Sequence, residues 1–196
     1  MDGMTWMASA MHAAQAQLET AAHNLSNVGT DGFRRARATL ALTGRGLVAG
    51  EAPVPDQGGI RPTGRPFDLA LLGPGAFRLA GGAATRAGAF ERDRDGLLRD
   101  AAGRPLLGER GPLRVTADAT IGADGSVREG GRTVDRIALP HGTTLRSGAL
   151  ESSNVDAIGE SLAILTAQRA FETAQKTFVA IDQTREKAVN DVVRLK

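Results

Sequence analysis

Histidine and aspartate are among the side chains of this sequence that could support metal binding or acid–base chemistry. The three histidines, His12, His23 and His141, are isolated, and His12 and His23 stand eleven positions apart, too far to share one metal ion on a helix. The run Asp93-Arg94-Asp95-Gly96 resembles part of a calcium-binding loop, but it lacks the glutamate that would complete the loop. We therefore predict no metal site and no cofactor.

Nucleophilic catalysis and phosphate binding are also poorly supported. The chain contains no cysteine and no Gly-x-Ser-x-Gly motif. The glycine-containing segments at residues 44–46 and 73–75 are not predicted to begin a helix, and no Gly-Lys pair occurs in the chain. A hydrolase remains an alternative only if the middle of the chain forms a pocket with convergent polar groups. We expect a protein that is not an enzyme.

The charge pattern favours protein partners over nucleic acid. The formal net charge is +2, and residues 154–196 carry six acidic and six basic side chains. A mixed-sign face of this kind suits side-by-side packing of proteins. The basic run of Arg34, Arg35 and Arg37 has no aromatic platform beyond Phe33, so we interpret it as a solvated or interfacial patch.

Membrane insertion and a cleaved secretory signal are not expected. No apolar run is long enough for a transmembrane helix. A secretory signal needs a positively charged start and a continuous apolar core, whereas the first Lys or Arg of this chain is Arg34. If the protein leaves the cytoplasm, we expect export without a cleaved signal peptide.

A long C-terminal helix is the main element that the sequence predicts. Apolar residues recur at alternating spacings of three and four, with Arg185 as the one break. No Gly follows Gly159 and no Pro follows Pro140, so a helix of about 40 residues, ~60 Å long, meets no interruption. The stripe consists of Ile164, Ala167, Phe171, Ala174, Phe178, Ile181, Ala188, Val192 and Leu195. A second apolar stripe, offset from the first, consists of Val155, Ile158, Leu162 and Leu165.

The N-terminus carries a matching stripe. Its members are Met4, Met7, Met11, Ala14, Leu18, Ala21, Leu25 and Val28. Because Ala and Met dominate, a second helix can approach closely and the seam can adjust. The long C-terminal helix needs a partner along most of its length, so we predict that the two ends pair with each other, with neighbouring subunits, or both. The simpler alternative is an ordinary amphipathic core helix at each end.

The segments between the helices predict an inserted β-rich domain. Scattered Gly and Pro after residue 35, with little core-forming material, are typical of a linker or long loop. Further on, many short apolar segments alternate with turn dipeptides such as Asp95-Gly96 and Asp124-Gly125, which indicates antiparallel strands. We therefore predict an α+β fold whose terminal helices pair as a coiled coil. The predicted division is an N-terminal helix and turn at 1–35, a linker at 36–60, a β-rich middle domain at 61–149 and the long C-terminal helix at 150–196.

Several stretches of the chain, taken together, resemble the flagellar rod and hook proteins. The sequence Asn-Leu-Ser-Asn-Val-Gly-Thr-Asp-Gly-Phe-Arg-Arg at 24–35 is similar to the N-terminal signature of that family. The sequence Leu-Glu-Ser-Ser-Asn-Val-Asp at 150–156, followed by Thr-Ala-Gln-Arg-Ala-Phe-Glu at 166–172, is similar to its C-terminal signature. Residues 63–70 and 85–90 are similar to middle-domain motifs of the proximal- and distal-rod proteins. The resemblance covers nearly the whole chain, in the right order.

The resemblance implies a structural subunit of the bacterial flagellar basal-body rod, with a lean toward the proximal-rod member. It implies that the terminal helices polymerise into the axial drive shaft, the periplasm-spanning rod, and that they order on assembly. The implied partners are copies of the chain itself, other axial rod and hook proteins, and the flagellar export apparatus. An alternative from another class is a helix-mediated adaptor or chaperone-like binding protein of a secretion or flagellar system, which would be a stable soluble monomer or small oligomer.

The residues that we expect at the assembly interface come from the stripes and the signatures beside them. They are Met4, Met7, Met11, Leu18, Leu25, Asn27, Val28, Gly32, Phe33, Asn154, Val155, Leu162, Ile164, Phe171, Phe178 and Ile181. Leu18, Leu25 and Val28 are expected to pack against the C-terminal stripe. We interpret Asn27 as a turn residue and Asn154 as the helix N-cap, in competition with Ser153. Gly32 is expected to supply a backbone angle that a Cβ atom would oppose.

Overall fold

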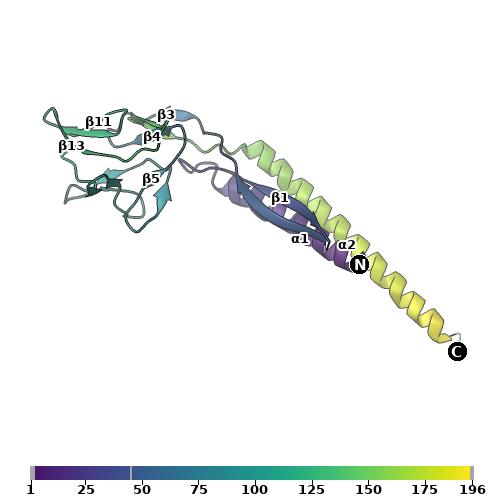
Figure 1. The fold of residues 1–196 in the computed structure, drawn as a ribbon. Helices are drawn as coiled ribbons and strands as arrows, with labels where there is room; N and C mark the ends of the chain where they lie inside the picture. Colours follow the sequence, from purple (N-terminus) through teal and green to yellow (C-terminus); the bar gives the residue numbers. More distant parts are fainter. Residues whose placement is uncertain (1–2, 45, 195–196) are drawn as a thin grey trace. The chain divides into compact units, whose positions relative to one another are not determined.

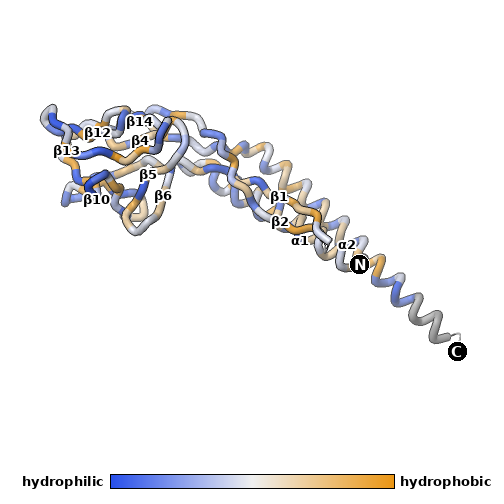
Figure 2. The backbone as a smooth tube through the Cα atoms, viewed as in Figure 1, coloured by the Kyte–Doolittle hydropathy of each residue, from blue (hydrophilic) through white to orange (hydrophobic). Residues whose placement is uncertain are grey.

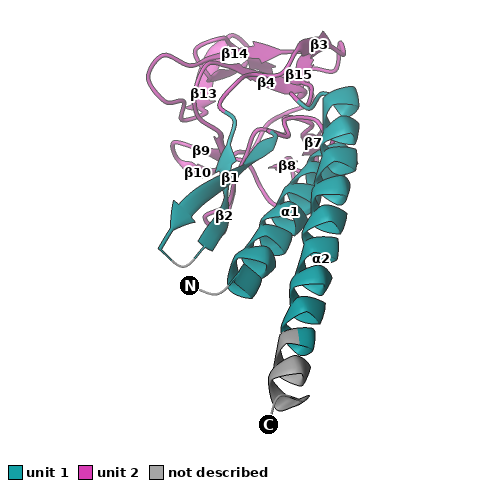
Figure 3. Ribbon diagram, turned by 90° about the vertical axis from the view of Figure 1, so that its right-hand side faces the viewer, with its two compact units in different colours: residues 1–26, 35–54, 155–196 teal, residues 27–34, 55–154 magenta. Residues whose placement is uncertain are grey.

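The computed structural model describes residues 3–44 and 46–194, with side chains described as far as residue 187. The chain forms two compact units (Figure 3). Unit 1 comprises residues 1–26, 35–54 and 155–196, and unit 2 comprises residues 27–34 and 55–154. The combination of long helices with small antiparallel sheets confirms the α+β class. Of the predicted C-terminal stripe, Leu195 and the side chains of Ala188 and Val192 lie outside the described part of the chain.

Unit 1 is built on two helices that lie side by side and run in opposite directions (Figure 1). Helix α1 spans Gly3–Ser26 and helix α2 spans Ala157–Arg194. Arg185 Nη1 donates to Met4 Sδ at 2.8 Å, which places the start of α1 beside the later turns of α2. The uninterrupted 38-residue α2 confirms the long C-terminal helix.

The start of α2 differs from the prediction. Asp156 is the capping residue, because its Oδ1 accepts a hydrogen bond from the Ile158 N–H at 3.1 Å. Asn154 has another role, since its Nδ2 donates to the Asp56 carbonyl oxygen at 2.8 Å. Residues 149–151 form a strand and α2 begins at Ala157, although we predicted the C-terminal helix over residues 150–196. The assignment of Asn154 as N-cap was therefore wrong, and so was a helical segment beginning at residue 150.

The prediction of a linker over residues 36–60 was wrong, because most of this segment forms a hairpin. Strands β1 (Ala36–Thr43) and β2 (Gly46–Pro53) pair antiparallel, with Leu42 opposite Leu47. Gly46 has a φ of 126° and lies at the tight reversal, where a left-handed backbone is needed. The glycines therefore make the turn of a hairpin, and the residues between them supply its strands.

The hairpin of unit 1 is held by helix α1. Ser9 Oγ accepts a hydrogen bond from the Leu47 N–H at 3.3 Å, and Thr20 Oγ1 donates to Glu51 Oε1 at 2.6 Å. A two-stranded ribbon is marginally stable by itself in water, so this contact explains why the segment is ordered.

Unit 2 consists of short antiparallel strands. They are β3 (Ile60–Pro62), β4 (Leu69–Leu72), β5 (Phe77–Arg78), β6 (Ala84–Thr85), β7 (Glu91–Arg92), β8 (Leu98–Arg99), β9 (Leu107–Gly108), β10 (Gly111–Pro112), β11 (Thr120–Ile121), β12 (Ser126–Glu129), β13 (Arg132–Arg136), β14 (Thr144–Ser147) and β15 (Ala149–Glu151). Between β5 and β13, strands that follow one another in sequence form four separate sheets, β5–β6, β7–β8, β9–β10 and β11–β12–β13. The pairs β3–β15 and β4–β14 are long-range, and they bring the end of the domain back to its beginning.

The core of unit 2 is aliphatic with one aromatic pair. The rings of Phe77 and Phe90 meet edge to face with centroids 5.1 Å apart. Around them lie Leu69, Leu71, Leu79, Leu98, Leu106, Leu113, Val115, Ala119, Ile121, Val127, Ile137 and Leu145. Figure 2 shows apolar and polar stretches interspersed along the chain of this unit. Burying this aliphatic set stabilises unit 2 despite the small number of aromatic residues.

Candidate assembly surfaces and a buried polar cluster

The predicted C-terminal stripe forms a seam along α2. Its buried or half-buried positions recur at spacings of three and four, and every other side chain described in this helix is exposed. The seam consists of Ala157, Glu160, Ile164, Ala167, Phe171, Ala174, Phe178 and Ile181. Phe171 is only half-buried, so the cost of about 3–5 kcal/mol that is typical of a Phe→Ala change at a filled core site does not apply to it in the single chain.

Helix α1 carries the predicted N-terminal stripe, and most of its large side chains are only partly buried. Met4, Met7, Met11, Leu18 and Leu25 are half-buried, while the alanines among them are buried. Val155, just before α2, is also half-buried. The specific pairing of Leu18 and Leu25 with residues of α2 remains a prediction. A seam of Ala and Met buries modest apolar area per residue, which leaves room for further burial when copies meet.

Asn24 joins α1 to the hairpin, a role that sequence reasoning did not assign. Its Nδ2 donates to the Ala36 carbonyl oxygen at 2.7 Å, and its Oδ1 accepts from the Ala36 N–H at 2.9 Å. The side chain is 1% exposed and satisfies both backbone groups of the first residue of β1. The sequence signal for this role was a polar residue near the end of an Ala-rich helix.

A row of three large aliphatic side chains remains exposed on α2. Ile158, Leu162 and Leu165 are 74%, 60% and 53% exposed, and their spacing places them on one face of the helix. We call this row the apolar ridge. Leu162 was among the predicted interface residues, and the ridge includes all of the second stripe except Val155.

A cavity of about 420 Å³ lies in unit 1 between α1, β1 and α2. Its apolar lining consists of small residues: Ala21 from α1, Ala36 and Ala38 from β1, and Gly159 and Ala163 from α2. We call this feature the small-residue groove.

One wall of the groove carries an ion pair. Arg35 Nη1 lies 3.4 Å from Glu160 Oε1, and Glu160 is buried. The two charges therefore offset each other within the wall. The remaining polar lining side chains are Gln17, Thr20, Asn24, Arg37 and Thr166.

In unit 2, the turn after α1 is set by two of the predicted residues. The Asn27 carbonyl oxygen accepts a hydrogen bond from the Thr30 N–H at 3.1 Å, which confirms Asn27 as a turn residue. Gly32 has a φ of 69°, and a Cβ atom there would lie 2.3 Å from the carbonyl carbon of Arg86. Both the angle and the close approach require glycine, as predicted.

The two terminal signatures meet within unit 2. The Gly32 N–H donates to the Glu151 carbonyl oxygen at 2.6 Å, and the Asn154 N–H donates to the Phe33 carbonyl oxygen at 3.4 Å. Gly32, Phe33 and Asn154 thus join the two ends of unit 2 through backbone bonds. Val28, in the same turn, is 42% exposed and is available for contacts outside this turn.

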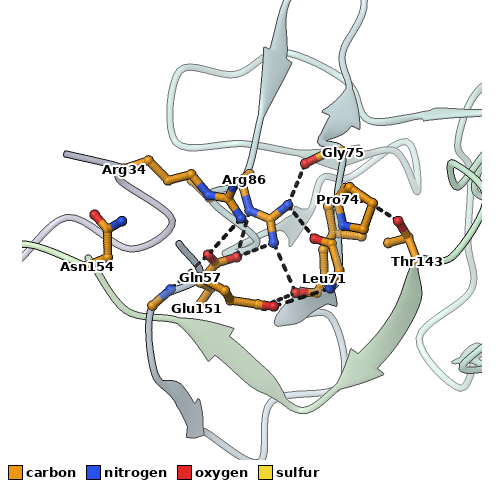
Figure 4. Close-up of polar contacts among 12 residues, drawn as sticks. Arg34, Gln57, Leu71, Pro74, Gly75, Arg86, Thr143, Glu151 and Asn154 are labelled. Atoms are coloured by element: carbon orange, nitrogen blue, oxygen red, sulfur yellow. Dashed lines mark hydrogen bonds and ion pairs between the residues drawn. The ribbon is translucent and has the colours of Figure 1, made fainter. Parts of the chain in front are cut away.

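A buried ion pair lies at this junction (Figure 4). Glu151 is 1% exposed, and its Oε2 lies 2.6 Å from Nη2 and 2.8 Å from Nε of Arg86. Glu151 Oε1 accepts from the Gly58 N–H at 3.3 Å and lies 3.8 Å from Nη2 of Arg34. Both carboxylate oxygens are therefore satisfied, as a buried charge requires.

Arg86 also ties together the backbone of β4 and of the turn that follows it. Its Nη2 donates to the carbonyl oxygen of Leu71 at 3.1 Å, and its Nη1 donates to those of Gly73 at 3.1 Å and Gly75. Gln57 adds to this site, because its amide donates to Leu71 O and accepts from the Gly73 N–H (Figure 4). The sequence motifs contained both Arg86 and Glu151, but nothing in the spacing indicated that they form a pair.

The described part of the chain contains neither a candidate group of metal ligands nor a candidate membrane-spanning helix. Among the described side chains, those of residues 3–44 and 46–187, no three His, Cys, Asp or Glu group closely enough to hold a metal ion. Among the helices of the same residues, none has the length and apolar character needed to cross a membrane.

The terminal segments match two protein-family models. Residues 6–34 match the one described as flagella basal body rod protein, and residues 146–191 match the one described as flagellar basal body rod FlgEFG protein C-terminal. The matched ranges cover most of α1 and most of α2. The segments that carry the seam, the ridge and the junction are thus those that the family models describe.

Curated relatives extend the similarity to nearly the full chain. The chain is 30% identical to the flagellar basal-body rod protein FlgF of Escherichia coli (strain K12), over 94% of this chain and 95% of that protein. It is 28% identical to FlgG of Bacillus subtilis (strain 168), over 93% and 96% respectively. The flagellar hook protein FlgE of Brucella abortus biovar 1 (strain 9-941) is 37% identical over 51% of this chain and 29% of its own length.

Proposed function

The chain belongs to the flagellar basal-body rod protein family and is a structural subunit of the rod; we propose that it polymerises into the axial drive shaft through its two terminal helices. The observation that carries this proposal is that the family-matched ends of the chain form a helix pair with unused apolar surface. Copies that stack along an axis would bury that surface, which water disfavours on a single chain.

The half-buried seam supports the same proposal. We infer that α1 and α2 form a coiled-coil pair and that each pair gains burial from neighbouring pairs. Met4, Phe171 and Ile181 are half-buried in the single chain. A repeated head-to-tail contact that does not close on itself produces a filament, as a rod requires.

Family membership supports the partners and the location that we propose. We propose that the chain assembles with copies of itself and with other rod and hook proteins in the flagellar basal body. Passage through the flagellar export apparatus and residence in the periplasm-spanning part of the rod belong to the same proposal. The terminal segments would carry the assembly contacts, and residues 61–149 would form the inserted domain. We propose a structural role without catalysis. FlgF and FlgG relatives match at similar identity, so the proximal position stays a prediction.

The test compares two single-charge substitutions in α2. Phe171→Asp places a charge in the seam, whereas Gln175→Asp places the same charge at an exposed position one turn later. Basal bodies purified from cells that express each variant are analysed by mass spectrometry. We expect the unmodified chain and Gln175→Asp in basal bodies and Phe171→Asp to be absent from them. Incorporation of Phe171→Asp at the unmodified level would contradict assembly through the seam, and absence of the unmodified chain would contradict the rod placement.

A further inference from the structure

We propose that the apolar ridge of one copy docks in the small-residue groove of a second copy. This inference rests on the proposed rod function and specifies the contact by which copies meet. Ridge and groove belong to the same unit of the fold, so every copy carries both.

The ridge has the composition of a contact surface. Ile158, Leu162 and Leu165 stand exposed next to one another, while the following positions on that face are Arg169 and Glu172. The apolar row therefore ends after about two helical turns. A patch this short is suited to a local protein contact, because a membrane-bound helix would need its apolar face to continue.

The groove complements the ridge in length and shape. Its α2 wall runs from Gly159 to Thr166, about two turns, which equals the length of the ridge. The floor of small side chains leaves space for branched aliphatic ones, as when ridges of one helix pack into grooves of another. The Arg35–Glu160 pair offsets two of the charges in the lining, and the third charged lining residue, Arg37, is exposed, so its guanidinium can stay in water when an apolar side chain enters.

An apolar surface continues along the hairpin beyond the groove. Leu40 and Leu42 of β1 follow Ala36 and Ala38 at two-residue spacing and therefore share their face of the strand. Leu42 is 72% exposed, although it lies opposite Leu47 of β2. This row gives an incoming ridge additional apolar surface on the hairpin side.

Ridge and groove lie on different faces of α2. The ridge positions and the groove positions on this helix are rotated by about 100° from each other, as the 3.6-residue repeat requires. One copy can therefore use its ridge on one neighbour and its groove on another. Such a heterologous contact propagates along an axis.

Disulfide trapping tests the contact, because the chain contains no cysteine of its own. Leu162→Cys on the ridge and Ala38→Cys in the groove are introduced into separate copies and expressed together, and isolated basal bodies are oxidised. We expect a disulfide-linked dimer from the mixture and none from either variant alone. Both substitutions in one chain should give a ladder of linked species. A twofold contact would stop at the dimer, which would overturn the propagating arrangement.

Two matched controls move each cysteine by one residue. Ser161→Cys leaves the ridge face, and Thr39→Cys lies on the opposite face of β1. The contact would be overturned if the control pairs cross-linked as efficiently as Leu162→Cys with Ala38→Cys. It would also be overturned if Leu162→Cys and Ala38→Cys gave no cross-link in basal bodies that contain both variants. Either outcome would leave the rod function intact. If Ala38→Cys alone is missing from basal bodies, Ala163→Cys takes its place as the groove position. A chain that never reaches basal bodies, even unmodified, would overturn the rod function itself.

Discussion

Replacing Arg86 by alanine should destabilise unit 2 strongly. The substitution leaves the Glu151 carboxylate, 1% exposed, without its main partner, and it removes donors from the carbonyl oxygens of Leu71, Gly73 and Gly75. Breaking a buried ion pair by removing one member costs about 3–5 kcal/mol. Small domains have about 5–15 kcal/mol of total stability, so this loss is a large part of it.

The assay is urea denaturation followed by circular dichroism, combined with hydrogen exchange measured by mass spectrometry. Hydrogen exchange shows whether the loss of stability occurs in unit 2. The fluorescence of the chain's one tryptophan, Trp6, reports on α1 in unit 1 and would miss that loss. We expect Arg86→Ala to lower the free energy of unfolding of unit 2 by about 3–5 kcal/mol.

Arg136→Ala is the matched control, because it removes an arginine from an exposed ion pair in the same unit. Its Nη2 lies 3.3 Å from Asp124 Oδ2, and the two side chains are 48% and 53% exposed. Solvated pairs contribute about 0–1 kcal/mol, so the control should have little effect. Equal losses from Arg86→Ala and Arg136→Ala would refute the reasoning that burial gives the Arg86–Glu151 pair its importance.

Two further predictions concern unit 2. Gly32→Ala should lower the free energy of unfolding by at least about 1–2 kcal/mol, which is the cost of a left-handed backbone for a residue with a Cβ atom. The φ of Gly32 is 69°, and the new Cβ atom would also lie 2.3 Å from the backbone of Arg86. Gly29→Ala is the control, because the space around its Cβ position is open, and it should leave the midpoint of urea unfolding nearly unchanged. Similar shifts of the midpoint in Gly32→Ala and Gly29→Ala would contradict this reasoning. The Arg99 hydrogen bond lowers the pKa of Asp93 below its ordinary 3.8, so this carboxylate stabilises the fold above that pH, and the contribution is lost as the pH falls through the lowered pKa. The stability difference between the unmodified chain and Asp93→Asn should therefore shrink as urea titrations move from neutral pH to below 3.8, and a difference independent of pH would argue against this role.

The helices could be predicted from the sequence because their signal is local. Spacings of three and four depend only on the pitch of an α-helix, and the seam positions from Ile164 to Ile181 follow that spacing. The hairpin of residues 36–53 was missed because its glycines and prolines match the composition of a linker. It becomes ordered through contacts with α1, such as Thr20 with Glu51, and strand periodicity gives no sign of such contacts.

The buried polar cluster was beyond sequence reasoning for a different reason. Arg86 and Glu151 are 65 positions apart, and no local pattern indicates which charges will be buried together. The glycines of the motifs indicate which backbone segments lie close together better than the charged residues do. A Cβ atom on Gly88 would lie 1.6 Å from the Leu69 carbonyl oxygen, so that glycine marks a close approach of two segments. Gly32 could be assigned in the same way.

The predicted interface residues separate into two physical groups. Gly32, Phe33 and Asn154 take part in backbone bonds that join distant segments of unit 2, whereas Phe171 and Leu162 have apolar surface that the single chain leaves in water. Substitutions in the first group should act on the stability of an isolated chain. A polar substitution at Leu162 should leave that stability nearly unchanged, because the side chain is already 60% exposed, and should act only where copies meet. The family signatures therefore combine residues that close the fold with residues left available for assembly.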